Sequence, residues 1–246
     1  MPYVPAGQLS ALPAGHPCET CPVRPITFCR RLDPRTLASL RALGTAQRLQ
    51  PEQPLFHEGD PAGRVFMVTA GALKIYTLLG DGRRQVTGFM FPGDFLGISV
   101  DDEYAFSVEA LSEAELFWFS RPCFDAFVEA NPELERELYR LAAHELAAAQ
   151  QQMVLLGRKT AAERVASFFL NLLKRAEHIS GKPETRFDLP MSRLDIADYL
   201  GLTKETVSRM LAVLRSARLI RLEAQDRVQV LDRPGLQDMA AGYGCG

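Results

Sequence analysis

The sequence has few of the groups that catalysis requires. Only four histidines occur among its 246 residues, and they are scattered along the chain as His16, His57, His144 and His178. No nucleophile–base pair and no glycine loop of the phosphate-binding kind is present. Because a catalytic site brings such groups within mutual reach, the sequence predicts that the protein is not an enzyme.

Long apolar runs and a basic leader are also missing. No segment approaches the roughly 20 consecutive apolar residues that a membrane-spanning helix needs. The first eighteen residues contain four prolines and no lysine or arginine, whereas a secretory signal begins with a positively charged region. The sequence therefore predicts a cytoplasmic protein with no membrane partner.

The chain has no excess of charge of either sign. It carries 28 basic and 30 acidic residues, for a net charge of −2, and its 24% charged and 47% hydrophobic composition is that of an ordinary globular protein. Residues 191–233 hold eight basic and six acidic residues, a local net charge of +2. This bias is weak, so a nucleic-acid-binding function must rest on a motif.

Cysteine is scarce, yet three of the five cysteines lie within twelve residues, as Cys18, Cys21 and Cys29. In a reducing compartment, clustered cysteines more often bind metal or act in redox chemistry than form disulfides. An iron–sulfur cluster needs four protein ligands, usually thiolates. Cys18-x2-Cys21 supplies two converging thiolates, and Cys29 can close a loop around a cluster. A zinc site or metal-free thiol redox sensing uses the same residues.

The hydrophobic pattern separates a β-rich region from a helical one. Residues 1–33 are rich in proline and predict an irregular arm, and 34–43 fit a short amphipathic helix. Short apolar runs alternate with EGD, GDG and PGD turns up to residue 120, which is typical of a β-sandwich or barrel. A helix over 131–157 then carries leucines at positions 134, 138, 141 and 155. This spacing favours a seam with a second copy as well as contact with its own β-domain.

Residues 193–211, RLDIADYLGLTKETVSRML, have the spacing of a helix-turn-helix. Ala197 lets two helices approach closely, and Gly201 supplies the tight turn between them. Thr203 is the predicted N-cap of the second helix, and Val207 anchors this helix to the first. Side chains on its exposed face can reach base edges and phosphates in the major groove. The predicted DNA-contacting residues are Ser192, Arg193, Thr203, Lys204, Glu205, Thr206, Ser208 and Arg209.

The order of these parts resembles the CRP/FNR family of bacterial transcription regulators, in particular its FNR- and FixK-like branch. The resemblance covers about residues 34–232 and is carried by GDPAGRVFMVTAGALKIYTLLGDGRRQVTGFMFPGDFLG, LLGRKTAAERVASFFLNL and LPMSRLDIADYLGLTKETVSRML. It implies an α+β fold with an N-terminal jelly-roll β-roll of the cyclic-nucleotide-binding type and a C-terminal winged helix-turn-helix. The expected parts are the arm (1–33), the β-roll sensor domain (34–130), a dimerisation helix (131–157), the DNA-binding domain (158–233) and a flexible tail (234–246).

The same resemblance implies what the protein reads. Glu205, Ser208 and Arg209 are similar to the Glu–Ser–Arg reading set of the FNR branch. They imply a homodimer that binds double-stranded DNA at a TTGAT-N4-ATCAA-like palindrome, with one half-site for each chain. The hairpin tip Gly80–Arg84 corresponds to the place where related activators touch RNA polymerase.

The resemblance also bears on the signal. The cyclic-nucleotide branch binds phosphate with an Arg–Ser pair, where this chain has Tyr104 and Ala105. Without those donors an anionic phosphate is poorly held, which argues against cAMP. The C-x2-C-x7-C spacing before a β-roll is similar to that of oxygen-sensing FNR-type proteins, which implies a [4Fe-4S] cluster on Cys18, Cys21 and Cys29.

The fourth cluster ligand departs from the family pattern. FNR-type proteins have a central cysteine in the last β-strand, where Phe117 stands in this chain. Cys123 is the predicted fourth ligand because a thiol in the first turn of a helix has a lowered pKa; a carboxylate, His16 and Cys245 are the other candidates. The alternative is a family regulator without a cluster, which senses zinc, thiol redox state or another small effector, such as haem, in the β-roll.

Overall fold

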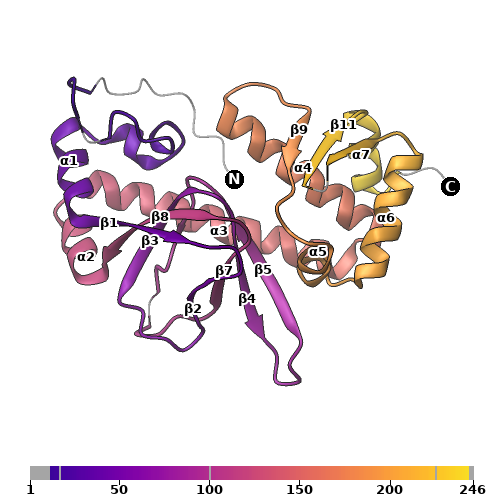
Figure 1. Cartoon of the computed structure of the whole chain (residues 1–246), viewed down its shortest axis with the longest axis horizontal. Coiled ribbons are helices and arrows are strands. Elements are labelled where there is room, and N and C mark those ends of the chain that lie inside the picture. Colours follow the sequence, from indigo (N-terminus) through magenta and orange to yellow (C-terminus); the bar gives the residue numbers. More distant parts are fainter. Residues whose placement is uncertain (1–11, 17, 100, 225, 244–246) are drawn as a thin grey trace. The chain divides into compact units, whose positions relative to one another are not determined.

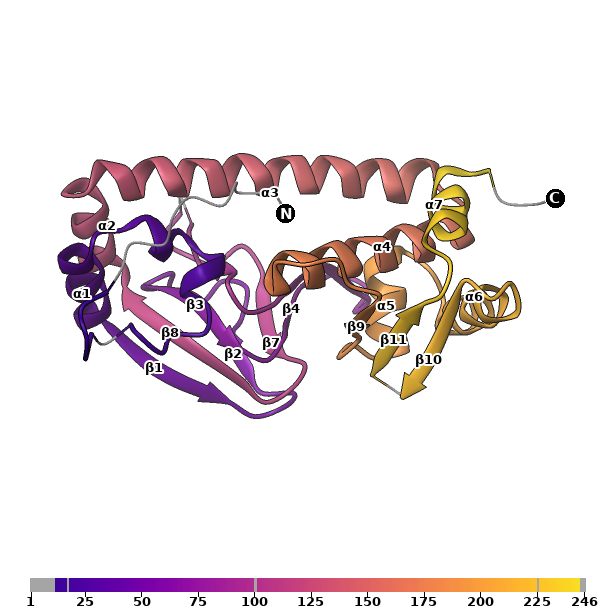
Figure 2. The same ribbon diagram turned by 90° about the horizontal axis from the view of Figure 1, so that it is seen from above.

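The chain divides into two compact units, and the boundary between them falls inside one long helix. The computed structural model describes residues 12–16, 18–99, 101–224 and 226–243. The described residues up to Ala143 form the first unit, and those from His144 form the second. The division falls inside α3 (Pro132–Arg158), which Figure 2 shows as one uninterrupted helix. Each half of α3 therefore packs within a different unit.

The first unit is the predicted β-roll with its flanking helices (Figure 1). Its helical elements before α3 are two short 3-10 helices (Arg24–Ile26 and Phe28–Arg31), α1 (Pro34–Leu43) and α2 (Arg121–Glu129). Its strands are β1 (Gly44–Leu49), β2 (Pro54–Phe56), β3 (Arg64–Ala70), β4 (Leu73–Leu78), β5 (Arg84–Met90), β6 (Phe95–Leu96), β7 (Ser107–Ala110) and β8 (Ala114–Ser120). Within the described residues they pair into antiparallel sheets of order β1-β8-β3-β6 and β2-β7-β4-β5.

Strand β8 contributes to two separate hydrophobic cores. Ala114 and Leu116 are buried in a core to which both sheets contribute. Phe117 and Phe119 belong to a second core, together with the cysteine-containing arm. Because successive side chains of a strand point to opposite faces of the sheet, the two cores lie on opposite faces of β8.

The arm is more ordered than the sequence predicts. In its described part, Val23 and Phe28 are buried in the second core, beside Cys18 and Cys29. Short 3-10 helices leave no helical or strand periodicity in the sequence, which is why the pattern indicated only an irregular segment. The arm is thus a packed layer on the outer face of the sheet that contains β8.

The leucines that the sequence singled out on α3 pack against other residues of the same chain. Leu134 and Leu155 are buried, and Leu138 and Leu141 pack against the second core. These contacts agree with the expected packing within the chain, and the expected seam with a second copy along the same stripe stays a prediction. A 3–4 spacing identifies the apolar face of a helix, but it does not say what covers that face.

The second unit is a winged helix-turn-helix (Figure 1). Its further helices are α4 (Ala161–Ser180), α5 (Arg193–Leu200), α6 (Lys204–Ser216) and α7 (Arg233–Ala241), and its strands are β9 (Arg186–Asp188), β10 (Ile220–Ala224) and β11 (Arg227–Val230). The strands pair in the order β10-β11-β9. A capping box of Thr160 and Glu163 starts α4, directly after the end of α3.

The predicted flexible tail over 234–246 is wrong for its first part, which forms α7; residues 244–246 lie outside the described residues. Asp232 caps this helix by accepting a hydrogen bond from the Gly235 amide at 3.0 Å. Leu236 and Ala240 are buried, and Lys159 Nζ donates to the Ala240 carbonyl at 2.9 Å. None of the helices in the described part of the chain has both the length and the apolar character needed to cross a bilayer.

Candidate DNA-binding surface and cysteine cavity

The turn between α5 and α6 has the geometry that the spacing predicts. Gly201 has a φ of 61°, in the left-handed region where a side chain would be strained. Ala197 and Val207 are both buried, so the two helices pack closely. Thr203 Oγ1 accepts a hydrogen bond from the Thr206 amide at 3.2 Å and caps α6. These contacts fix the direction in which α6 leaves the turn.

Four of the predicted DNA-contacting residues are exposed on α6: Lys204, Glu205, Ser208 and Arg209. Ser208 lies four residues after Lys204, and Arg209 lies four after Glu205, so all four lie on neighbouring parts of one helical face. Ser208 Oγ donates to the Lys204 carbonyl at 2.9 Å, and Arg209 Nη2 lies 3.4 Å from Thr206 Oγ1. The surface offers a carboxylate, a hydroxyl and two cations, which can pair with base edges and phosphates.

The remaining predicted contact residues have structural roles as well. Ser192 caps α5: its hydroxyl accepts from the Asp195 amide at 3.1 Å and donates to the Asp195 carboxylate at 2.6 Å. Thr203 and Thr206 bond to each other across the first turn of α6, with their hydroxyl oxygens 3.0 Å apart. Arg193 is half-buried. Sequence reasoning identified the Thr203 cap but not the Ser192 cap, because caps and phosphate contacts favour the same small polar side chains.

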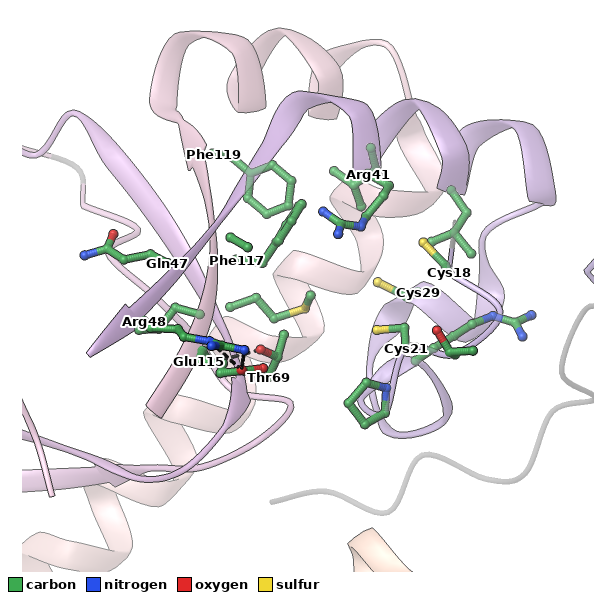
Figure 3. A pocket seen from close by; sticks show the side chains of 18 residues that line it. Cys18, Cys21, Cys29, Arg41, Gln47, Arg48, Thr69, Glu115, Phe117 and Phe119 are labelled. Carbon is green, nitrogen blue, oxygen red and sulfur yellow. Dashed lines mark hydrogen bonds and ion pairs between the residues drawn. The ribbon is translucent and has the colours of Figure 1, made fainter. Parts of the chain in front are cut away.

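In the first unit, Cys18, Cys21 and Cys29 line one cavity of about 560 Å³ (Figure 3). Figure 3 shows the three cysteines on the wall that the arm forms, with Phe117 and Glu115 of β8 on the wall that the sheet forms. The cavity thus brings together residues almost a hundred positions apart.

Burial raises the pKa of two of these thiols, Cys29 and Cys18. It raises the pKa of Cys29 to about 12, and the neighbouring Cys21 and Cys18 add to the rise. Burial also raises the pKa of Cys18, with a further contribution from Cys21, whereas Arg41 and Arg24 lower it. The mutual influence of the three sulfurs shows that they share one electrostatic environment, and both arginines line the same cavity.

The cavity holds three thiols, one fewer than the four protein ligands that an iron–sulfur cluster takes. Phe117, which the resemblance places at the family's central cysteine, has the Arg41 guanidinium 3.9 Å above the centroid of its ring. Cys123 is exposed on α2 and does not line the cavity. Glu115 is the carboxylate among the lining residues, and Arg48 forms an ion pair with it at 2.9 Å. Cys245 lies outside the described residues.

His16 anchors the arm and has no free ring nitrogen for a metal. Its Nδ1 accepts a hydrogen bond from the Cys18 amide at 3.1 Å. The other nitrogen, Nε2, therefore carries the proton and donates to the Pro34 carbonyl at 2.8 Å. The side chain ties Cys18 to the start of α1, so we assign it a structural role in place of its candidate role as a ligand.

Tyr104 stands where the resemblance expects the phosphate-binding pair of the cyclic-nucleotide branch. The side chain is buried, and its ring stacks on Phe56 with centroids 3.7 Å apart. Its hydroxyl donates to the Arg64 carbonyl at 2.8 Å and accepts from the Arg64 amide at 3.2 Å. A packed aromatic ring with a satisfied hydroxyl thus stands in place of a cationic donor.

These thiols should differ in reactivity in the metal-free protein. With Cys245→Ser as background, we expect a maleimide at neutral pH to modify Cys123 first and Cys29 last. The rise of the Cys29 pKa from 9.0 to about 12 lowers its thiolate fraction roughly a thousandfold, and only the thiolate reacts. Peptide mass spectrometry over time measures the order, with urea-unfolded protein as the control. Equal rates for Cys123 and Cys29 in the native protein would contradict the packed arm.

A β-roll, a long helix and a winged helix-turn-helix with an exposed polar reading face define a DNA-binding transcription regulator. Two family models match this division: residues 46–131 match the cyclic nucleotide-binding domain, and residues 163–239 match the Crp-like helix-turn-helix domain.

Known proteins resemble the whole arrangement. The nitrogen fixation regulation protein FixK of Bradyrhizobium diazoefficiens is 38% identical over 93% of this chain and 96% of its own length. The transcriptional activator protein FnrL of Cereibacter sphaeroides is 36% identical over 88% of this chain and 89% of its own. The structure of FixK2 from Bradyrhizobium japonicum superposes with a TM-score of 0.74 at 34% identity, over 80% of this chain and 96% of that chain. The chain belongs to the CRP/FNR family, and its relatives are regulators, which confirms that it is not an enzyme.

Proposed function

We propose that the protein is a homodimeric regulator that reads TTGAT-N4-ATCAA-like palindromes through α6 and responds to oxygen through an iron–sulfur cluster held by the arm. The observation that carries the sensing part is the cavity that Cys18, Cys21 and Cys29 share. The exposed face of α6 carries the reading part. Arg209 suits the O6 and N7 acceptors of guanine, and Glu205 suits the N4 donor of cytosine.

A stripe on α3 supports the homodimer. Tyr139, Leu146 and Met153 are 77%, 62% and 70% exposed, and they recur every seven residues. A heptad repeat keeps such side chains on one face of a paired helix. A second copy of the same helix, related by two-fold symmetry, would cover them.

The tip of the β4–β5 hairpin supports contact with RNA polymerase. Leu78 and Leu79 are 60% and 42% exposed there. Asp81 holds the turn by accepting from the Arg83 side chain at 2.7 Å. An ordered tip that presents two leucines and charged side chains suits a protein partner.

The cavity offers the donor type that an iron–sulfur cluster takes, since such clusters are held mainly by thiolates. Zinc takes thiolates as well, so iron and zinc analysis distinguishes the two. In the described part of the chain, no group of three His, Cys, Asp or Glu side chains is arranged to hold a single metal ion. Cys18, Cys21 and Cys29 would hold the cluster, and Arg41 and Arg24 would stabilise the Cys18 thiolate. When bound, the cluster supplies iron chemistry that is sensitive to oxygen.

The arm is linked to α3 by direct contacts. Cys18 and Cys29 share a core with Leu134 in the first turn of α3. Arg31 of the arm forms an ion pair with Glu137, which also pairs with Arg140 on the same helix. A change in the packing of the arm therefore reaches the helix on which dimer formation depends. The buried ring of Tyr104 speaks against the alternative of a cyclic-nucleotide effector.

Purification without oxygen tests the proposal. We expect a coloured protein with about four irons and four sulfides per chain, and a loss of operator affinity on exposure to air. Cys29→Ser should lower the iron content. Comparison of Cys123→Ser with Glu115→Gln identifies the fourth ligand, because only the variant that lacks a ligand should lose iron. A colourless wild-type protein with equal operator affinity in air and without it would refute oxygen sensing and leave the DNA-binding function intact.

A further inference from the structure

One arginine joins the end of α3 to the turn of the helix-turn-helix. Arg164, in the first turn of α4, donates through Nη2 to the Leu156 carbonyl at 2.7 Å and through Nε to the Lys159 carbonyl at 2.9 Å. Its Nη1 donates to the carbonyls of Leu200 at 2.8 Å and Gly201 at 3.4 Å. All three nitrogens are thus engaged, with two carbonyls at the end of α3 and two at the end of α5.

These carbonyls are those that a helix leaves without partners. The last C=O groups of a helix lack intrahelical donors, and they lie at the negative end of the helix dipole. A guanidinium satisfies several of them at once, because it carries five N–H donors in a rigid plane and a full positive charge. A lysine has one nitrogen and cannot bridge the two helix ends in this way.

Two further observations place α5 against α3 at the same point. Gln152 Nε2, on α3, donates to the Tyr199 carbonyl at 3.0 Å. A Cβ added to Gly201 would lie 3.4 Å from Arg164 Nη1 and 3.5 Å from Leu156 Cδ2. The turn before α6 therefore sits directly on the end of α3, with side-chain bonds on both sides of it.

We propose that Arg164 is a positioning residue that fixes the spacing between the two half-sites the dimer accepts. The inference rests on the proposed function, in which two paired α3 helices present two α6 helices to one palindrome. The α5 end is held by Arg164 and Gln152, and α6 is packed on α5 through Val207. The direction of α6 is thus set relative to the end of α3.

The length of the DNA spacer between the half-sites can be varied to measure how rigidly α6 is held. One additional base pair between the half-sites moves the second half-site by about 3.4 Å and rotates it by about 35°, since B-DNA turns once in 10–10.5 base pairs. A dimer with fixed recognition helices cannot follow this change. A dimer whose helix-turn-helix swivels on α3 can follow it in part, although each α6 still reads the same bases.

The test measures affinity for palindromes with four and with five base pairs between identical half-sites. For the wild-type protein we expect a clear preference for the four-base-pair spacer. Arg164→Ala should reduce the ratio of the two affinities by about five- to tenfold. The cost of a single base change within a half-site should stay as in the wild type. Arg164→Lys should behave like Arg164→Ala. Lysine keeps the positive charge, but it lacks the planar set of N–H donors that bridges the two helix ends.

Controls separate this role from simple stabilisation. Arg158→Ala removes an exposed cation at the last residue of α3 and should leave the ratio unchanged. If Arg164→Ala is unfolded at the assay temperature, Gln152→Ala tests the positioning role in its place. It should reduce the ratio of the two spacer affinities as well, but by less than Arg164→Ala. An unchanged ratio in the folded variants, or wild-type behaviour of Arg164→Lys, would overturn the positioning role. A wild-type protein without any spacer preference would overturn the palindrome reading itself.

Discussion

Phe119→Ala should destabilise the first unit by about 3–5 kcal/mol, the range for removing a fully buried phenylalanine. Its ring is 1% exposed and lies 5.4 Å from Phe117, 5.5 Å from Phe124 and 6.3 Å from Phe95 between centroids. It belongs to the core that holds the arm, so its loss should also loosen Cys18 and Cys29. Denaturant unfolding measures the first effect, and alkylation of the two thiols in the native state measures the second.

Leu116→Ala is the matched control on the same strand. Leu116 is equally buried and also borders the cysteine cavity, but it belongs to the core that both sheets share and not to the core of the arm. Its removal should cost about 2–5 kcal/mol, while the arm thiols stay protected under native conditions. If both variants expose the thiols to the same extent, the packing of the arm does not depend specifically on the face of β8 that carries Phe119.

Arg209→Ala should cost about 1–3 kcal/mol at the base pair that Arg209 reads, and it should relax the sequence preference there. The side chain is exposed on α6 and is steadied by Thr206, which suits a bidentate contact with guanine. Affinity for operators that carry each base at that position gives the result. Equal preference in wild type and variant would show that α6 does not read DNA in the proposed orientation.

Lys204→Ala, five residues earlier on the exposed part of α6, is the comparison for Arg209. A phosphate contact carries no sequence information. Its loss should weaken binding to all operators to a similar extent and reduce the slope of log affinity against log salt by about 1. Glu205→Ala should resemble Arg209→Ala instead, because its carboxylate suits a base edge.

The helix-turn-helix was predictable because its signals are local. Gly201 marks a left-handed turn, Thr203 a cap, and Ala197 with Val207 a close crossing; the structure has each of these features. The β-roll was predictable for a similar reason, since short apolar runs between turn sequences indicate strands whatever they pair with. The strand predicted over 113–120 is β8.

The packing of the arm and the existence of α7 were not predictable from such signals. Val23 and Phe28 show no periodicity, and their burial depends on a face of the sheet formed about forty to ninety residues later in the chain. Helix α7 buries only Leu236 and Ala240, and a helix this short is marginal by itself. It depends on contact with α4 and on the bond from Lys159.

The cavity was predictable only in part. The cysteine spacing indicated the thiols, but local patterns do not report which side chains of a distant strand face them. The position of Phe117 followed from the family resemblance, whereas the place of Glu115 in the wall that the sheet forms required the fold. Arg164 carried no signal at all in the sequence, because an arginine in the first turn of a helix looks like any solvated charge.

The alternation along β8 also bears on how such sensors diverge. Odd positions from 115 to 119 face the arm or its cavity, and Ala114 and Leu116 belong to the interior that both sheets share. Substitutions at positions 115 and 117 can change the chemistry of the cavity and leave the interior that both sheets share in place, whereas Phe119 is needed for the stability of the first unit. A lineage can therefore exchange one signal for another at these two positions while the β-roll still folds, and the same strand can serve regulators with different stimuli.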